Sequence, residues 1–227
     1  MTPRVPVESQ IIPTGIGLGM TRRHDVVGAG IRRAWSTIAR WGAIGPESAD
    51  GRRFGTFGSG SIVCFPVNTI FNERYIYIGC NTMIGPHVTL SAGMVPDQKC
   101  LSDPVVRIGD RCLIGKGSGI VGHFSIDIGN DVWTGHHVYI TDQNHGYEDV
   151  DRPISAQTMP ERPVSIGDGS WIGHGTVVLP GAQIGRHVTV GANSVVTGVL
   201  PDFCVAVGNP ARVIRRYDAD AGWVRSA

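Results

Sequence analysis

The stretch IGDGSWIGHGTVVLPGAQIGRHVTVGANSV, residues 166–195, repeats one six-residue pattern five times. Each hexad begins with an aliphatic residue and has Ser, Thr, Ala or Val at its fifth position. The pattern continues for one more hexad to Pro201 and also runs for three hexads each from Ile78, Ile108 and Ile128. This gives fifteen hexads, and only the one that begins at Thr134 lacks an aliphatic first residue. A short repeat that returns through most of a chain predicts a solenoid.

A longer period lies over the hexads. The second position is Gly in ten of them, and the five exceptions fall at every third hexad: Ser91, Val121, Thr141, Leu179 and Thr197. Eighteen residues with three similar sides predict a coil shaped as a triangular prism. First-position side chains would fill its interior, glycine would permit its tight corners, and parallel ladders about 4.8 Å apart would stack the coils.

Composition restricts the class of protein and its partners. The chain has 227 residues, 41% of them apolar, and a net charge of +1 without a block of like charge. This balance argues against nucleic acid or an acidic membrane surface as the partner. Five scattered cysteines without a CxxC pair, no apolar run long enough to span a bilayer, and an N-terminus interrupted by prolines together predict a cytoplasmic protein.

The repeats also divide the chain. We expect an N-terminal extension at 1–53 with a short amphipathic helix within 26–42, a β-helix at 54–201, and a C-terminal cap and tail at 202–227. Two loop insertions interrupt the β-helix, at 95–107 and 146–163. Insertions of this length without secondary structure are often functional.

The hexads resemble those of the hexapeptide-repeat acyltransferases over roughly residues 78–216. The resemblance implies an all-β solenoid, a left-handed parallel β-helix. The left hand comes from the resemblance alone, because most parallel crossovers are right-handed. The segments DQNH (142–145) and PISAQ (153–157) are similar to elements of the galactoside, maltose and polysaccharide O-acetyltransferases of that family.

This likeness implies an acyl-CoA-dependent O-acyltransferase that acts on a sugar or polysaccharide hydroxyl. His145 would be the catalytic general base, since a hydroxyl must lose its proton as it attacks a thioester. The anionic tetrahedral intermediate would need hydrogen-bond donors. The residues expected to orient His145 or to bind the acceptor are Asp142, Asn144, His123 and Met159.

The resemblance also implies where acetyl-CoA or another acyl-CoA would bind, and that the protein is a homotrimer with its cleft between subunits. The expected contacts are Trp171, Gly173, His174, Ala192, Thr197 and Gly198, with Arg212 and Arg215 at the nucleotide end. The eighteen-residue period independently predicts one column along a prism edge, composed of Lys116, His136, His174 and Ala192. No metal is expected.

Two departures from the family pattern leave questions open. His174 stands where the galactoside enzymes have a serine thought to help the oxyanion, and His123 stands where they have an acceptor-binding aspartate. The alternatives are therefore an N-acyltransferase acting on an amino sugar, a non-catalytic β-helix scaffold, and a zinc-dependent enzyme resembling carbonic anhydrase.

Overall fold

The computed structural model describes residues 22–226. The chain divides into two compact units, one ending at Ile38 and the other running from Ala39 to Ala227. The first contains most of helix α1 (Arg22–Trp41), which confirms the helix expected within 26–42 and extends it toward the N-terminus.

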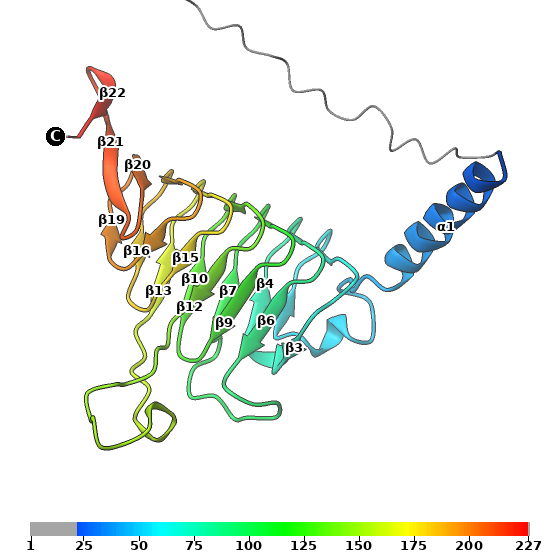
Figure 1. Ribbon diagram of the computed structural model, residues 1–227, viewed down its shortest axis with the longest axis horizontal. Helices are drawn as coiled ribbons and strands as arrows, with labels where there is room; N and C mark the ends of the chain where they lie inside the picture. Colours follow the sequence, from blue (N-terminus) through cyan, green and yellow to red (C-terminus); the bar gives the residue numbers. More distant parts are fainter. Residues whose placement is uncertain (1–21, 227) are drawn as a thin grey trace, which may run out of the picture. The chain divides into compact units, whose positions relative to one another are not determined.

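The second unit consists of three sheets that the chain visits in strict rotation (Figure 1). We call them sheets I, II and III. Sheet I contains β1 (Thr56–Phe57), β4 (Ile76–Ile78), β7 (Val106–Ile108), β10 (Ile126–Ile128), β13 (Val164–Ile166), β16 (Gln183–Ile184) and β19 (Val199–Leu200).

Sheet II follows sheet I in every coil and ends in a hairpin. Its strands are β2 (Ile62–Val63), β5 (Met83–Ile84), β8 (Leu113–Ile114), β11 (Trp133–Thr134), β14 (Trp171–Ile172), β17 (Thr189–Val190), β20 (Cys204–Val207), β21 (Arg212–Asp218) and β22 (Gly222–Arg225). Sheet III completes each coil with β3 (Ile70–Phe71), β6 (Thr89–Ala92), β9 (Gly119–Gly122), β12 (Tyr139–Thr141), β15 (Val177–Val178) and β18 (Val195–Val196). All pairs are parallel except those that β21 makes with β20 and β22.

The interior of the prism is filled as the hexads predict. All fifteen first-position side chains are buried, including Thr134. The hydroxyl of Thr134 accepts the N–H of Gly115 at 2.8 Å and contacts the carbonyl of Gly135 at 3.1 Å, so its polar group is satisfied inside an apolar core. The single departure from an aliphatic first position is therefore tolerated because the hydroxyl bonds to corner backbone.

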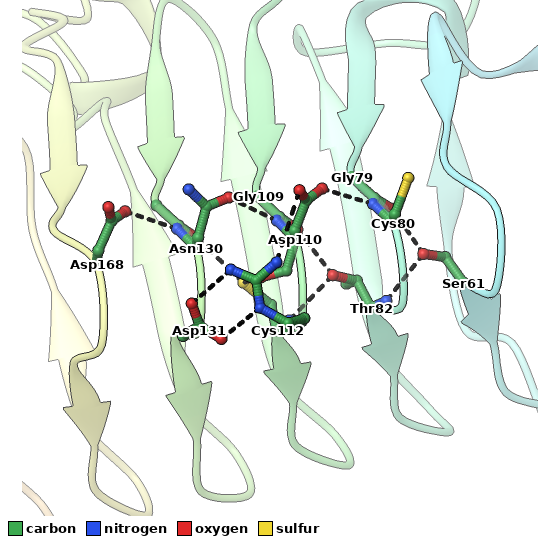
Figure 2. Close-up of polar contacts among 12 residues, drawn as sticks. Ser61, Gly79, Cys80, Thr82, Gly109, Asp110, Cys112, Asn130, Asp131 and Asp168 are labelled. Atoms are coloured by element: carbon green, nitrogen blue, oxygen red, sulfur yellow. Dashed lines mark hydrogen bonds and ion pairs between the residues drawn. The ribbon is translucent and has the colours of Figure 1, made fainter.

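The corner between sheets I and II is held by side chains that reach back to the preceding coil (Figure 2). Asp110 Oδ1 accepts the N–H of Cys80 at 2.7 Å, Asn130 Oδ1 that of Asp110 at 2.9 Å, and Asp168 Oδ1 that of Asn130 at 2.7 Å. Each bond satisfies a backbone donor that the corner turns away from the ladders. The side chains at the third position of these hexads thus link each coil to the preceding one.

One predicted boundary is wrong. Val196 pairs with Val178, yet Leu200, only four residues later, pairs with Ile184, so the last predicted hexad (196–201) is shortened by two residues. Ala206 then pairs with Val190 in sheet II. The β-helix therefore continues beyond residue 201 to Val207. Adjacent aliphatic residues at 199 and 200 hide the shift in the sequence.

Both insertions leave the prism at the corner between sheets III and I, and they extend on the same side of the unit (Figure 1). The first lies between β6 and β7, and the second between β12 and β13, where it includes the 3-10 turn η3 (Ile154–Ala156). Two further 3-10 turns, η1 (Gly51–Arg53) and η2 (Glu73–Tyr75), belong to the first coil. The outer face of sheet III is therefore bordered by two loops.

Candidate active site

The outer face of sheet III carries a row of side chains that forms the floor of a groove. Phe71, Ser91, Val121 and Thr141 are register partners on four successive strands. Three of them occupy the second hexad position where Gly is replaced in every third hexad. The eighteen-residue signal thus marks the groove floor, since a side chain at this position points outward from sheet III.

A cavity of about 460 Å³ lies over this floor. Of the residues predicted to act on the acceptor, it brings together four: His123, Asn144, His145 and Met159. The rest of its lining is Phe71, Thr89, Ser91, Gly93, Met94, Val121, Tyr139, Thr141, Gln143 and Leu179. Gly93 and Met94 follow β6, just before the insertion predicted at 95–107, and were not expected as site residues because the repeat pattern assigns them to a hexad.

Asp142 does not line this cavity, and it cannot orient His145 as predicted. Its side chain is fully buried, and its two carboxylate oxygens accept the backbone N–H groups of His123, Phe124 and Ser125 at 2.6–2.8 Å. Three charge-assisted bonds occupy the carboxylate. Asp142 therefore fixes the neighbouring coil's turn at 123–125, and it positions His123 rather than His145.

His145 stands on the base of the second insertion, not on the last residue of a coil. Strand β12 ends at Thr141, and an antiparallel ladder begins at a bridge between Gln143 and Glu161. The N–H of Gly146 donates to the carbonyl of Thr158 at 2.9 Å and continues that ladder. The side chain of Asn144 is exposed. The insertion thus begins three residues before its predicted start.

His145 also borders a second, smaller cavity of about 290 Å³, shared with Glu148, Arg162 and Thr197. Of the described residues, none forms a hydrogen bond with its imidazole. Glu148 lies in the same cavity, and its Oε2 accepts the N–H of Tyr147 at 2.9 Å. The imidazole is thus placed between two cavities, with both ring nitrogens available to bound molecules.

His123 is the second imidazole in the larger cavity. Burial lowers its pKa below the ordinary value, and the nearby charges of Asp142 and Glu161 oppose that effect in part. A lowered pKa favours the neutral ring at pH 7, which can both donate and accept a hydrogen bond. This is a property suited to a residue that contacts a hydroxyl.

The predicted column is confirmed at the corner between sheets II and III. His137 N–H donates to the carbonyl of Lys116, Gly175 N–H to that of His136, and Asn193 N–H to that of His174, so these corners stack coil on coil. The rings of His136, His137 and His174 lie 5.6–6.5 Å apart between centroids. Across residues 22–226, no three His, Cys, Asp or Glu side chains form a metal-binding group.

The residues predicted to bind acyl-CoA are spread over two sides of the prism. Trp171 lies on the outer face of sheet II, and Gly173, His174 and Ala192 lie at the corner between sheets II and III. Thr197 and Gly198 lie at the corner between sheets III and I, while Arg212 and Arg215 lie on β21. The chain alone does not gather them: of this set, only Thr197 lines a cavity that includes His145.

Sheet II ends in a pair of like charges that the sequence pattern does not reveal. Arg215 on β21 is the register partner of Arg225 on β22, and both are exposed. Within the described part of the chain, neither forms an ion pair with a carboxylate. Two directly opposed cations repel one another unless an anion lies between them. The guanidinium groups of Arg215 and Arg225 thus belong to directly opposed positions at the end of sheet II.

Comparisons with known proteins agree with the fold and the repeats. The model "Bacterial transferase hexapeptide (six repeats)" matches residues 163–198, and "Hexapeptide repeat of succinyl-transferase" matches residues 105–141. An Escherichia coli protein named as a lipopolysaccharide biosynthesis O-acetyl transferase, WbbJ, is 41% identical over 164 residues, which are 69% of this chain and 79% of that protein. A Mycobacterium tuberculosis protein named as an acetyltransferase is 37% identical over 122 residues, which are 54% of this chain but only 40% of that protein.

Among solved structures, a variant of AntD, an N-acyltransferase from Bacillus cereus in complex with dTDP-4-amino-4,6-dideoxyglucose and coenzyme A, has a TM-score of 0.65. It is 20% identical, and the match covers 78% of this chain and 92% of that one, which shows a shared fold. The triangular parallel coil, its hexapeptide period and these matches agree with the expected left-handed β-helix. The chain belongs to the hexapeptide-repeat acyltransferase family.

Proposed function

We propose that the protein transfers an acyl group from acetyl-CoA or another acyl-CoA to a hydroxyl of a sugar or polysaccharide, with His145 as the general base. The observation that carries this proposal is the position of His145 between two cavities on one groove. One cavity can hold the acceptor and the other the thioester, so a single imidazole can reach both. A cytoplasmic location belongs to the proposal; no described helix has the length and apolarity needed to cross a bilayer.

The acceptor would occupy the larger cavity. His123 and Asn144 provide polar groups there, and Met159 with Tyr139 provides apolar surface. This mixture suits a sugar, which has hydroxyls at its edge and C–H groups on its faces. The amide of Asn144 and the neutral ring of His123 can each donate and accept, as hydroxyl recognition needs.

The chemistry would be direct transfer in a ternary complex. The neutral His145 imidazole takes the proton of the attacking hydroxyl, whose oxygen bonds to the thioester carbon. The resulting oxyanion needs a hydrogen-bond donor. The C–S bond then breaks, and the imidazolium returns its proton to the leaving thiolate, so the ester and free CoA are formed.

We further propose that the working form is a homotrimer. Except for Thr197 and Gly198, the residues expected to bind acyl-CoA lie on sheet II and its corners, whereas His145 lies over sheet III, so a second copy would be needed to present all of them to one donor molecule. The outer face of sheet II also exposes apolar side chains in register, at Met83, Trp133 and Trp171. A second copy that placed this face near the groove of the first would cover apolar surface and complete the site.

The test combines activity and assembly. A thiol-release assay with several acyl-CoAs and a panel of carbohydrates should identify a productive pair, and mass spectrometry should find the acylated product. Sensitivity of that product to mild hydroxylamine would distinguish an ester from an amide, and so separate O-acylation from the N-acylation alternative. Light scattering should give the mass of three chains of 24.2 kDa.

Two outcomes would refute these proposals separately. A monomer that is fully active would contradict the trimeric site without affecting the chemistry. Failure to bind any acyl-CoA by calorimetry would contradict the enzymatic function and favour the scaffold alternative.

A further inference from the structure

A third cavity, of about 670 Å³, lies beside the proposed acceptor cavity. Phe71 lines both, so the two cavities adjoin at this residue. The third cavity is also lined by Arg53, Asn72, Gln98 and Lys99. The proposed function leaves this third cavity without a role.

Two amides in this cavity are each held at one end and free at the other. Asn72 uses both hydrogens of Nδ2, which donate to the carbonyls of Ala92 and Val95 at 2.5 and 2.8 Å, so its Oδ1 has no partner among the described residues. Gln98 Oε1 accepts the N–H of Met94 at 2.7 Å, and its Nε2 is likewise unpartnered within residues 22–226. Among the described residues, Oδ1 of Asn72 is therefore a free acceptor and Nε2 of Gln98 a free donor. Both are fixed in place by the hydrogen bonds that the two side chains make with the first insertion loop.

The charges of the cavity are nearly balanced. The carboxylate of Glu73 pairs with Arg53 at 3.3 Å, and Arg74 lies 4.0 Å from Asp103. Lys99 is left with no ion pair in the described part of the chain, and Asp97 lines the same cavity. A single unpaired cation beside two fixed amides and an aromatic residue favours a sugar residue over a nucleotide diphosphate, which would need several unpaired cations.

The two cavities are aligned along the coil axis. From Thr141, which lines the acceptor cavity together with His145, to Phe71 there are three ladder steps, which correspond to about 14 Å. One sugar ring is much shorter than this distance. We infer that the acceptor is a glycan chain of several residues, with one sugar acylated near His145 and a second, non-reacting sugar bound beyond Phe71 by Asn72, Gln98 and Lys99. This inference rests on the proposed function.

The experiment compares glycans of one to five residues, built on glucose, galactose, N-acetylglucosamine and rhamnose, with acetyl-CoA as donor. We expect kcat/KM to rise at least tenfold at the length that crosses Phe71. In Gln98→Glu, which keeps the oxygen that holds Met94 but loses the donor, and in Lys99→Ala, this gain should shrink at least threefold, while the rate with the shortest productive glycan is unchanged. Lys99→Arg should keep most of the gain, and Arg107→Ala, on the outer face of sheet I, all of it.

Binding to the folded His145→Ala variant keeps this inference separate from the catalytic proposal. Saturation-transfer NMR with the same glycans should show affinity that increases with length even though no transfer occurs. If neither wild type nor His145→Ala prefers longer glycans, the distal subsite is refuted, whatever the rates. If length dependence of binding is present and lost in Lys99→Ala, but no ester forms with any glycan, the subsite stands and the proposed reaction is refuted.

Discussion

Oδ1 of Asp142 accepts the backbone N–H of His123 at 2.8 Å, which links the end of β12 to the turn of the preceding coil. The two residues are nineteen positions apart, about one coil, so the bond crosses from one layer of the prism to the next. Because His123 faces the acceptor cavity while Asp142 is buried beneath it, the carboxylate supports the site from below.

This relationship predicts the effect of Asp142→Asn. An amide would place hydrogens against backbone donors and lose one of the accepting oxygens, so we expect a loss of about 1–3 kcal/mol in the free energy of unfolding. Urea denaturation would measure it. Asp151→Asn, an exposed change on the second insertion, is the matched control and should stay near wild type. Equal effects of the two changes would show that the buried carboxylate has no special role.

Replacement of His145 by Gln should reduce kcat by about 10²–10⁴, because a positioned general base contributes about that much. The fold should remain intact, since the imidazole is exposed and forms no hydrogen bond with the described residues. Thermal unfolding checks the fold, and single-turnover rates check the chemistry. A folded variant with full activity would remove His145 from the mechanism.

Stability should depend on pH through His123. Its pKa in the folded protein is lowered by burial, so the unfolded chain binds the proton more readily. The contribution of the neutral ring is present above the ordinary pKa, near 6.5, and is lost as the pH falls from there through the lowered value. Wild type should therefore lose more stability than His123→Gln between pH 7.5 and 5. Parallel curves for the two proteins would be inconsistent with the lowered pKa.

Two glycines offer a matched pair of substitutions. A Cβ on Gly115 would lie 2.1 Å from the carbonyl oxygen of Gly135, whereas one on Gly198 would meet nothing within 4 Å. Gly115→Ala should destabilise the protein by about 1–3 kcal/mol through overpacking, and Gly198→Ala by less than about 0.5 kcal/mol. Calorimetric melting would compare them. Because Gly198 is also a predicted acyl-CoA contact, a raised KM for acyl-CoA in the stable Gly198→Ala variant would support that role.

The opposed arginines predict a phosphate effect. Arg215→Ala and Arg225→Ala should each raise KM for acyl-CoA about two- to fivefold with kcat unchanged, the range expected of exposed ion pairs. Added salt should reduce the difference between variants and wild type, because it screens the same interaction. Arg107→Ala is again the control. If the two variants match it, the hairpin does not bind the donor.

The repeat was readable from the sequence because each hexad position has one local environment. Ile78, Ile108 and Ile128 are buried and in register, as period and chemistry together require. The column that contains His136 and His174 also followed from counting, since a solenoid converts a sequence separation into a position in space.

The site was only partly readable, because it lies where the count is interrupted. The DQNH segment drew attention to His145, and the structure places His123, Asn144 and Met159 beside it. The structure gives Asp142 a different role from the one predicted. Whether its carboxylate faces a cavity or a backbone turn depends on the preceding coil, which the local sequence does not show. The cavity beyond Phe71 depends on the fold of the first insertion, for which no repeat position exists.

The sequence by itself determined the prism and its three faces, because the six- and eighteen-residue periods map directly onto corners and ladders. Tertiary structure alone decided where the β-helix ends, what Asp142 binds, and which side chains from the two insertions border His145. It also decided that Arg215 lies opposite Arg225. These features depend on contacts between segments of unequal length, and a period carries no information about them.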